Sequence, residues 1–308
     1  MSADDERATG PRTVVVTGAS AGLGHHAAEQ LAARGHRVVL ATRNPDRGLA
    51  AERSIRAHVG GADLVHLHLD LADLDSVRAA ASTLATLGPV HALLNNAGVV
   101  GSTEQRSTAQ GSELQMGTNH LGHFAWTALV LPLLDPEVGR VVHLGSIAHR
   151  FATLDRRDPL AVGRYAGHRQ YARSKLAVML FGFELAQRLG DAGSTVRSIV
   201  AHPGLALDAA GPPRPDVAPA RPEPAWMRAA PGWVAQGKDT GARPLVHAAV
   251  GDGVRSGEYW GPGGPLQLTG APAVVPARQR AHDRAVAARL WTASERATGT
   301  AFALDALV

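Results

Sequence analysis

Short runs of apolar residues alternate with longer amphipathic stretches along most of the chain. The apolar runs are rich in valine and leucine, which is typical of strands buried on both faces of a parallel sheet. The stretches between them are rich in alanine and long enough for helices. The expected strands cover 13–17, 36–42, 63–69, 90–94, 140–145 and 195–201, and the expected helices cover 22–34, 46–58, 73–86, a long stretch ending near residue 134, 168–190 and 238–250.

This alternation predicts an α/β fold of the Rossmann type: a doubly wound parallel sheet with helices on both faces, in three αβα layers. A further amphipathic helix is expected over about 276–296, with Val286, Leu290 and Trp291 on one face. Because no boundary interrupts the pattern, we expect a single domain. The expected divisions are a disordered tail over 1–12, the domain over 13–297 and a C-terminal tail over 298–308.

Residues 205–236 interrupt the alternation of strands and helices. Seven prolines lie between Pro212 and Pro231, so no helix or strand is expected to run through it. A long irregular stretch inside a domain is typical of a lid or binding loop. We interpret it as a proline-rich substrate loop, with a disordered insert as the alternative.

Composition narrows the classes of function. The chain has 308 residues, 45% hydrophobic, with no apolar run long enough for a membrane span and a polar first twelve residues. A cytoplasmic enzyme with no membrane partner is therefore expected. The absence of cysteine excludes disulfides and thiol chemistry. The histidines do not have a spacing that would set the geometry of a metal site, so we expect no metal. A net charge of +4 is too small to indicate a nucleic-acid partner.

A glycine-rich loop follows the first expected strand and opens the first expected helix. Gly18, Gly22 and Gly24 stand in the run TGASAGLG over 17–24. Glycines allow a tight turn and close backbone approach to a diphosphate, which then sits at the positive end of the helix. The alternative is an ordinary glycine-rich turn, but the order strand, loop, helix favours a dinucleotide site.

The end of the second expected strand indicates which dinucleotide is bound. An acidic residue there binds the ribose 2′-hydroxyl of NAD, whereas arginine accommodates the 2′-phosphate of NADP. Here the residue is Arg43, and no acidic residue lies between His36 and Asn44. We therefore expect NADP, with a merely solvated strand-end arginine as the alternative.

A tyrosine and a lysine share one face of a later helix. Tyr171 and Lys175 are spaced i, i+4, and an ammonium beside a phenol lowers the phenol pKa from about 10, which makes a usable acid/base pair. Ser146 follows an expected strand, at the sheet edge where such folds bind ligands. Taken singly, each has an ordinary alternative: a surface Tyr–Lys pair, or a turn serine.

Together these motifs resemble the short-chain dehydrogenase/reductase family over about residues 12–297. The resemblance also rests on Asp70 and on NNAG at 95–98. The phrases NHLGHF (119–124), SIAHR (146–150), YARSK (171–175) and SGEYWGPGG (256–264) resemble the retinol-dehydrogenase-like and WW-domain-oxidoreductase-like branch.

The resemblance implies a role for each matching residue. Tyr171 is the expected general acid/base, Lys175 holds the nicotinamide ribose and tunes the phenol, Ser146 polarises the substrate oxygen, and Asn119 supports a proton-relay water. Relatives commonly form dimers or tetramers, so a homodimer or homotetramer is implied. The implied cofactor-binding residues are Gly18, Ser20, Gly22, Leu23, Gly24, Arg43, Asp70, Leu71, Asn96, Ala97, Gly98, Tyr171, Lys175, Pro203 and Gly204.

The chain also departs from the family pattern. Asp208 stands where relatives often carry a threonine that contacts the nicotinamide amide; a carboxylate there accepts an amide N–H but repels the diphosphate. Ala21 replaces a basic residue of many NADP-using relatives. Four apolar residues are candidates for the substrate pocket: Phe151, Trp226, Met227 and Trp233.

These observations predict an NADP(H)-dependent oxidoreductase that transfers a hydride between the nicotinamide and a ketone, aldehyde or secondary alcohol, an apolar small molecule. Two alternatives stay open. One is a regulatory or scaffolding protein that binds NADP without chemistry, and the other is an epimerase or dehydratase on the same fold. The substrate itself is not predictable from the fold.

Overall fold

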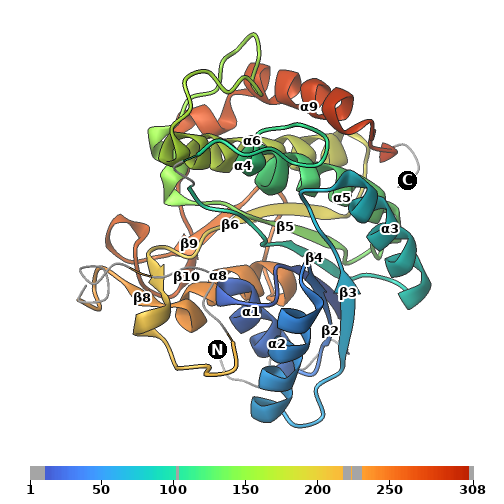
Figure 1. Ribbon diagram of the computed structural model, residues 1–308, viewed down its shortest axis with the longest axis vertical. Coiled ribbons are helices and arrows are strands. Elements are labelled where there is room, and N and C mark those ends of the chain that lie inside the picture. The colour runs from blue at the N-terminus through green and yellow to red at the C-terminus, as the bar shows by residue number, and fades with distance from the viewer. Residues whose placement is uncertain (1–10, 102–103, 218–222, 224–230, 305–308) are drawn as a thin grey trace.

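A central sheet organises the molecule. The computed structural model describes residues 11–101, 104–217, 223 and 231–304. Its main sheet has eight strands in the order β10-β9-β6-β5-β4-β1-β2-β3, all parallel except for the pair β9 and β10 (Figure 1). The strands are β1 (Thr13–Thr17), β2 (Arg37–Thr42), β3 (Leu64–His68), β4 (Ala92–Asn95), β5 (Arg140–Leu144), β6 (Arg197–Ala201), β9 (Tyr259–Pro262) and β10 (Pro272–Val274).

Helices cover both faces of the sheet (Figure 1). This arrangement confirms the predicted single-domain Rossmann-type fold with three layers. One face carries α1 (Gly22–Ala33), α2 (Pro45–His58) and α8 (Lys238–Val250). The other carries α3 (Leu74–Leu84), α4 (Leu114–Met116), α5 (His123–Val130), α6 (Gly167–Asp191) and α9 (Arg284–Thr298).

Strand β1 shows why the apolar runs are continuous. Successive side chains of a strand point to opposite faces of the sheet. Val15 therefore packs into the apolar cluster that contains Phe124 and Trp126, while Val14 and Val16 pack into the cluster around Leu31. All three valines are fully buried, so both faces of β1 require apolar residues.

The site is positioned at β1, where the order of the strands along the sheet reverses. Strand β1 lies between β2 and β4 and is parallel to both, although β4 comes much later in the chain. Connections leaving β1 and β4 therefore run to opposite faces, and a crevice forms outside the carboxyl ends of these strands. The loops after β1, β2 and β4 all open at this edge.

The six expected strands are present, with ends within two residues of those predicted. The C-terminal helix differs, because α9 begins at Arg284 rather than near residue 276. Its start is set by Asp283, whose carboxylate accepts a hydrogen bond from the backbone N–H of Val286 (3.1 Å). Val286, Leu290 and Trp291 lie on the buried face, as predicted.

The proline-rich segment is closed at its base by two short strands. Strands β7 (Ala206–Leu207) and β8 (Gln236–Gly237), which flank the proline run and were not predicted, pair in parallel. The pairing joins residues far apart in sequence, which local propensity does not reveal. Residues Trp226 and Met227 lie outside the described residues.

The two expected tails are partly described. The first ten residues lie outside the described ranges, whereas Arg12 is buried. Beyond α9, the ring of Phe302 packs 5.0 Å from that of Phe124. Within the described ranges, no helix has the length and apolar character needed to cross a membrane.

Candidate active site

The glycine loop and the loop after β4 pack directly against each other. Gly18 has a φ of +69°, and a Cβ atom there would lie 2.9 Å from the Cα of Ala97. A Cβ on Gly24 would lie 2.3 Å from Nδ2 of Asn96. Such distances exclude side chains at both glycines, so the loop can pack closely on the loop after β4, while Ser20–Leu23 stay partly exposed at the start of α1. This loop geometry at the start of a helix fits a dinucleotide diphosphate.

Thr17 links the two loops through its hydroxyl. Its Oγ1 accepts hydrogen bonds from the backbone N–H of Asn96 (2.9 Å) and of Ala97 (3.0 Å). The same oxygen lies 2.9 Å from Nε2 of His123. Asn96 returns a bond from its Nδ2 to the Thr17 carbonyl (2.8 Å).

His123 sets the direction of this network. The ring is buried, and this burial lowers the pKa of His123 to about 4, so it is neutral at pH 7. Its Nδ1 faces the carbonyl oxygen of Asn119 at 3.0 Å and must therefore donate. Nε2 is then the acceptor, and the Thr17 hydroxyl donates a hydrogen bond to it. The lone pairs of Thr17 are left for the amides of Asn96 and Ala97.

Asn119 stands in an irregular turn between α4 and α5. Residues Gly117–Gly122 form a π-helical turn, a feature frequent at functional sites. The Asn119 side chain is buried, accepts from the N–H of Val99 (2.8 Å) and donates to Oγ of Ser174 (2.9 Å). It thus joins the loop after β4 to the helix that carries Tyr171.

Lys175 is a buried ammonium beside the end of β5 and the Tyr171 ring. Its Nζ donates to the carbonyl of Leu144 at the end of β5 (2.8 Å) and lies 5.9 Å from the centre of the Tyr171 ring. A Cβ on Gly98 would lie 3.8 Å from this Nζ and 3.1 Å from Oδ1 of Asn119, so the three groups converge. Burial lowers the pKa of Lys175 from 10.5 to about 8, which leaves it mostly charged at pH 7.

Ser146 lies just beyond the same strand. It begins a short helical turn, Ile147–Phe151, and its Oγ accepts a hydrogen bond from the N–H of Ala148 (3.2 Å). The backbone carbonyl of Ser146 accepts from Nδ1 of His149 (2.6 Å). Both contacts hold the serine at the edge of the crevice, and its side chain remains partly exposed.

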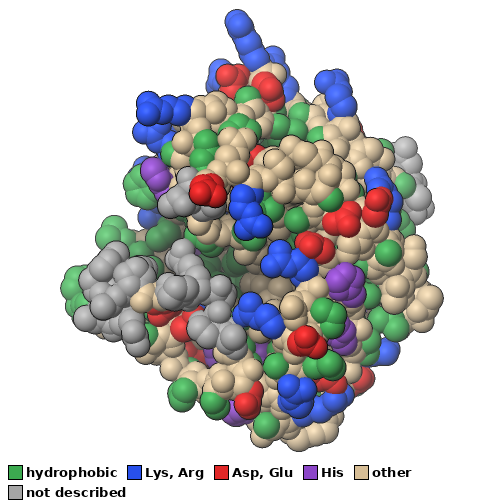
Figure 2. Space-filling model, in the orientation of Figure 1, with side chains coloured by type: hydrophobic (Ala, Val, Ile, Leu, Met, Phe, Trp, Pro, Cys, Tyr) green, Lys and Arg blue, Asp and Glu red, His purple; other side chains and the backbone are tan. Residues whose placement is uncertain are grey.

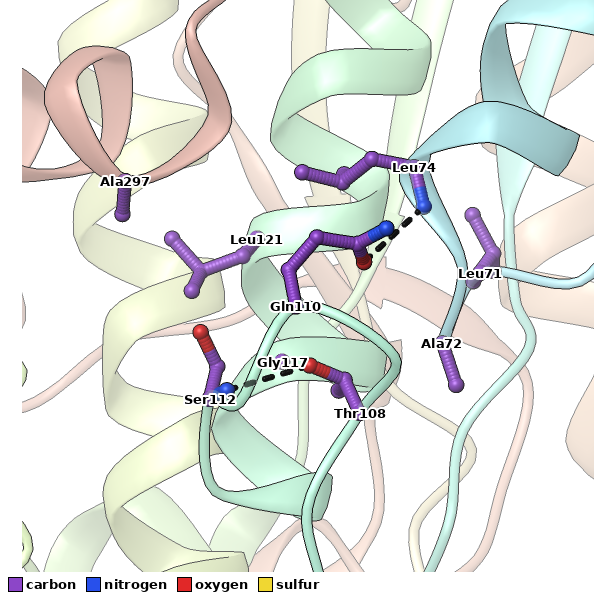
Figure 3. Close-up of a pocket in the computed structure, with 9 residues that line it drawn as sticks. All are labelled: Leu71, Ala72, Leu74, Thr108, Gln110, Ser112, Gly117, Leu121 and Ala297. Atoms are coloured by element: carbon purple, nitrogen blue, oxygen red, sulfur yellow. Dashed lines mark hydrogen bonds between the residues drawn. The ribbon is translucent and has the colours of Figure 1, made fainter.

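The residues expected at the adenosine end occupy the next loops. Arg43 follows β2 and is exposed. Asp70 closes a turn by accepting from the N–H of Ala72 (2.9 Å). The Leu71 side chain is buried and lines a pocket of about 10 Å³ bordered by Leu121 (Figure 3), close to the minimum for one water. That side chain is thus committed to the interior, and the Leu71 carbonyl packs against Gly122, where a Cβ would lie 2.2 Å from its oxygen.

The last expected cofactor loop contains Pro203 and Gly204. Gly204 has a φ of +69°, and a Cβ there would lie 2.1 Å from the carbonyl oxygen of Leu268. The Pro203 carbonyl accepts from Nε2 of Gln236 (2.9 Å), which holds this loop against β8. The space-filling view shows a hollow between the α6 half and the α1 half of the molecule, with basic side chains on one rim (Figure 2).

Sequence reasoning did not single out three residues of the network: Thr17, His123 and Ser174. The available signals were slight. Thr17 stands at the end of a strand before the first loop glycine, and His123 stands four residues after Asn119 on the same helical stretch. Neither position distinguishes a linking residue from an ordinary core residue until the packing of α5 on β1 is known.

The fold and the glycine loop are those of a dinucleotide-binding α/β protein. The sequence model described as short chain dehydrogenase matches residues 12–210. Retinol dehydrogenase 13 of Homo sapiens is 34% identical over 293 residues, which is 94% of this chain and 85% of that protein. The chain therefore belongs to the short-chain dehydrogenase family and is an oxidoreductase enzyme of the retinol-dehydrogenase-like branch.

Solved structures agree with this assignment. An uncharacterised protein from Mycobacterium Paratuberculosis has a TM-score of 0.77 and 36% identity, with 96% of this chain and 98% of that chain covered. L-sorbose reductase from Gluconobacter frateurii, solved with NADPH and L-sorbose, has a TM-score of 0.53 and 25% identity, with 66% and 72% covered.

Proposed function

We propose that this enzyme is an NADP(H)-dependent oxidoreductase that interconverts an apolar ketone or aldehyde and its alcohol. The observation that carries the proposal is the buried Lys175 ammonium. It lies 5.9 Å from the Tyr171 ring and is bonded to the end of β5, two residues before Ser146. A charge buried at this cost is typical of a catalytic site.

The residues of the chain divide the chemistry between them. The bound nicotinamide supplies or accepts the hydride. Tyr171 donates its phenol proton to the substrate oxygen in reduction and takes it back in oxidation. The positive charge of Lys175 favours the ionised phenol, and the Ser146 hydroxyl donates a hydrogen bond to the same substrate oxygen. Asn119 holds the relay by which the phenol is reprotonated.

Arg43 supports a preference for NADP. It follows β2 at the open edge of the sheet and is exposed, so its guanidinium is available to a 2′-phosphate. The similarity to L-sorbose reductase solved with NADPH agrees with this choice.

Exposed apolar side chains on segments linked to the turn after Ser146 support an apolar substrate. Phe151 is 86% exposed, Trp233 71% and Leu266 75%. Their segments are joined by hydrogen bonds: Arg150 donates to the Leu266 carbonyl (3.4 Å), and Thr269 donates to the Trp233 carbonyl (3.2 Å). Such a group of exposed apolar residues commonly marks a binding site. The likeness to retinol dehydrogenase 13 suggests retinal as a first substrate to test.

The test is NADPH oxidation at 340 nm with retinal, long-chain aldehydes and aryl ketones. We expect turnover by the wild type and by Tyr165→Phe, which alters another of the chain's three tyrosines. Tyr171→Phe should lower kcat at least about a hundredfold while NADPH still binds. Equal turnover by Tyr171→Phe contradicts the proposal, and cofactor binding without turnover on any carbonyl favours the non-catalytic alternative.

A further inference from the structure

The chain contains just two lysines, although 31 of its residues are lysine or arginine. One is Lys175 in the crevice described above. The other is Lys238, the first residue of α8. An ammonium is a compact charge with three rotatable donors, which suits a group that changes partners more than the planar guanidinium does.

Lys238 lies beside the glycine loop. A Cβ on Gly22 would be 3.6 Å from Nζ of Lys238. The start of α8 is held against α1, because Nε2 of Gln30 donates to the carbonyl of Asp239 (2.7 Å). Gly22 begins α1, and the N-terminus of this helix is where a dinucleotide diphosphate is expected. The Lys238 ammonium is therefore placed at the border of the diphosphate site.

Two carboxylates hold Lys238 in this structure. Its Nζ is paired with Asp208, and Oε1 of Glu223 lies 4.0 Å away. Glu223 also accepts from the backbone N–H of Asp208 (2.6 Å) and of Ala209 (3.1 Å). The Lys238 side chain is 13% exposed and that of Glu223 is 10% exposed. One ammonium thus faces two carboxylates, and the excess negative charge opposes an incoming diphosphate.

We propose that Lys238 binds the diphosphate of the dinucleotide by exchanging Asp208 for it. The proposal rests on the cofactor class of the proposed function. A charge-assisted bond from the ammonium to a phosphate oxygen replaces the bond to the carboxylate. Asp208 then acts as a competitor of the cofactor, and Glu223 keeps Lys238 at the site during the exchange. Lys238 therefore raises the affinity for the dinucleotide, and its ion-pair partner Asp208 lowers it.

The experiment measures the Kd of NADPH and of NADH by the change in their fluorescence on binding, without substrate. Lys238→Met should raise the Kd of both cofactors about tenfold, because both carry the diphosphate. Asp208→Asn should lower the Kd of NADPH and of NADH about threefold. The control is Arg56→Met, which removes an exposed pair with Glu52 at the far end of α2 and should change neither Kd. Thermal melts check that each variant is folded. If Lys238→Met does not fold, Lys238→Gln is used in its place.

The outcomes separate this proposal from the proposed function. Unchanged affinity in folded Lys238→Met or Lys238→Gln overturns it while leaving the oxidoreductase assignment in place. Weaker binding in Asp208→Asn also overturns the exchange, since Asp208 would then contact the cofactor itself. A loss confined to NADPH overturns it as well, because it would place Lys238 at the 2′-phosphate. Failure of the wild type to bind either dinucleotide refutes the proposed function.

Discussion

Replacing Lys175 by methionine should stabilise the protein at neutral pH. Burial lowers the pKa of Lys175 from 10.5 to about 8, so the charged form costs about 3 kcal/mol at pH 7. The substitution also removes the bond to the Leu144 carbonyl, which costs about 1 kcal/mol. The free energy of unfolding of Lys175→Met is therefore expected to exceed that of the wild type by about 2 kcal/mol at pH 7, while activity is lost.

The gain should depend on pH. Between pH 8 and 10.5 the unfolded chain binds more protons at Lys175 than the folded chain does, so wild-type stability rises with pH in this window relative to the variant. In urea denaturation without cofactor, the free energies of unfolding of Lys175→Met and the wild type should differ by less than about 1 kcal/mol at pH 9.5. Lys238→Met, which removes a paired ammonium, should lose stability at pH 7. A Lys175→Met variant less stable than the wild type at pH 7, or a gain unchanged at pH 9.5, refutes the reasoning.

Three further substitutions test the glycine loop, the adenosine end of the site and the attachment of the proline-rich segment to α1. Gly24→Ala places a Cβ 2.3 Å from Nδ2 of Asn96, and it should cost about 2 kcal/mol of stability by urea denaturation and weaken NADPH binding. Arg43→Glu should raise the KM for NADPH at least about tenfold in steady-state assays and leave that for NADH nearly unchanged. Arg214→Met leaves the half-buried Glu29 carboxylate without its two bonds of 2.9 and 2.6 Å, and it should lower stability by about 2 kcal/mol in thermal or urea unfolding.

Each of these substitutions has a matched control. Gly190→Ala lies near the end of α6, where an added Cβ meets no atom within 4 Å, and it should be neutral or slightly stabilising. Arg53→Glu changes an exposed arginine on α2 and should leave the NADPH preference intact. Arg255→Met removes a pair whose arginine is 85% exposed, and it should change stability by less than about 0.5 kcal/mol. Equal effects in variant and control would contradict the reasoning.

The central sheet could be predicted because its strands are buried on both faces. The core of the run TVVVT at β1 is apolar because Val14 and Val15 pack on opposite layers. Such a run predicts a strand even when the neighbouring strands are not known. Strands β9 and β10 were not predicted. They are short: β9 contains Gly261 and Pro262 and β10 begins with Pro272, residues that are unusual in strands, and their pairing depends on neighbours distant in the chain.

The site was predictable where spacing alone brings groups together. Tyr171 and Lys175 face the same way because they are one helical turn apart. The ion pair of Asp208 with Lys238 joins residues 30 positions apart across the proline-rich segment, and no local pattern indicates it. The link from Thr17 to His123 spans 106 positions and likewise depends on how α5 packs on β1.

The Thr17 hydroxyl has a practical consequence for redesign of this enzyme. It links the loop after β4, through the amides of Asn96 and Ala97, to His123, which in turn bonds to Asn119, so a change that shifts β1 disturbs the proposed cofactor loop and the proposed proton relay at once. Arg43 stands outside this network, at the end of a neighbouring strand. On the proposed assignment of Arg43 to the 2′-phosphate, cofactor preference can be altered at the β2 terminus while the positions of Tyr171 and Lys175 are preserved.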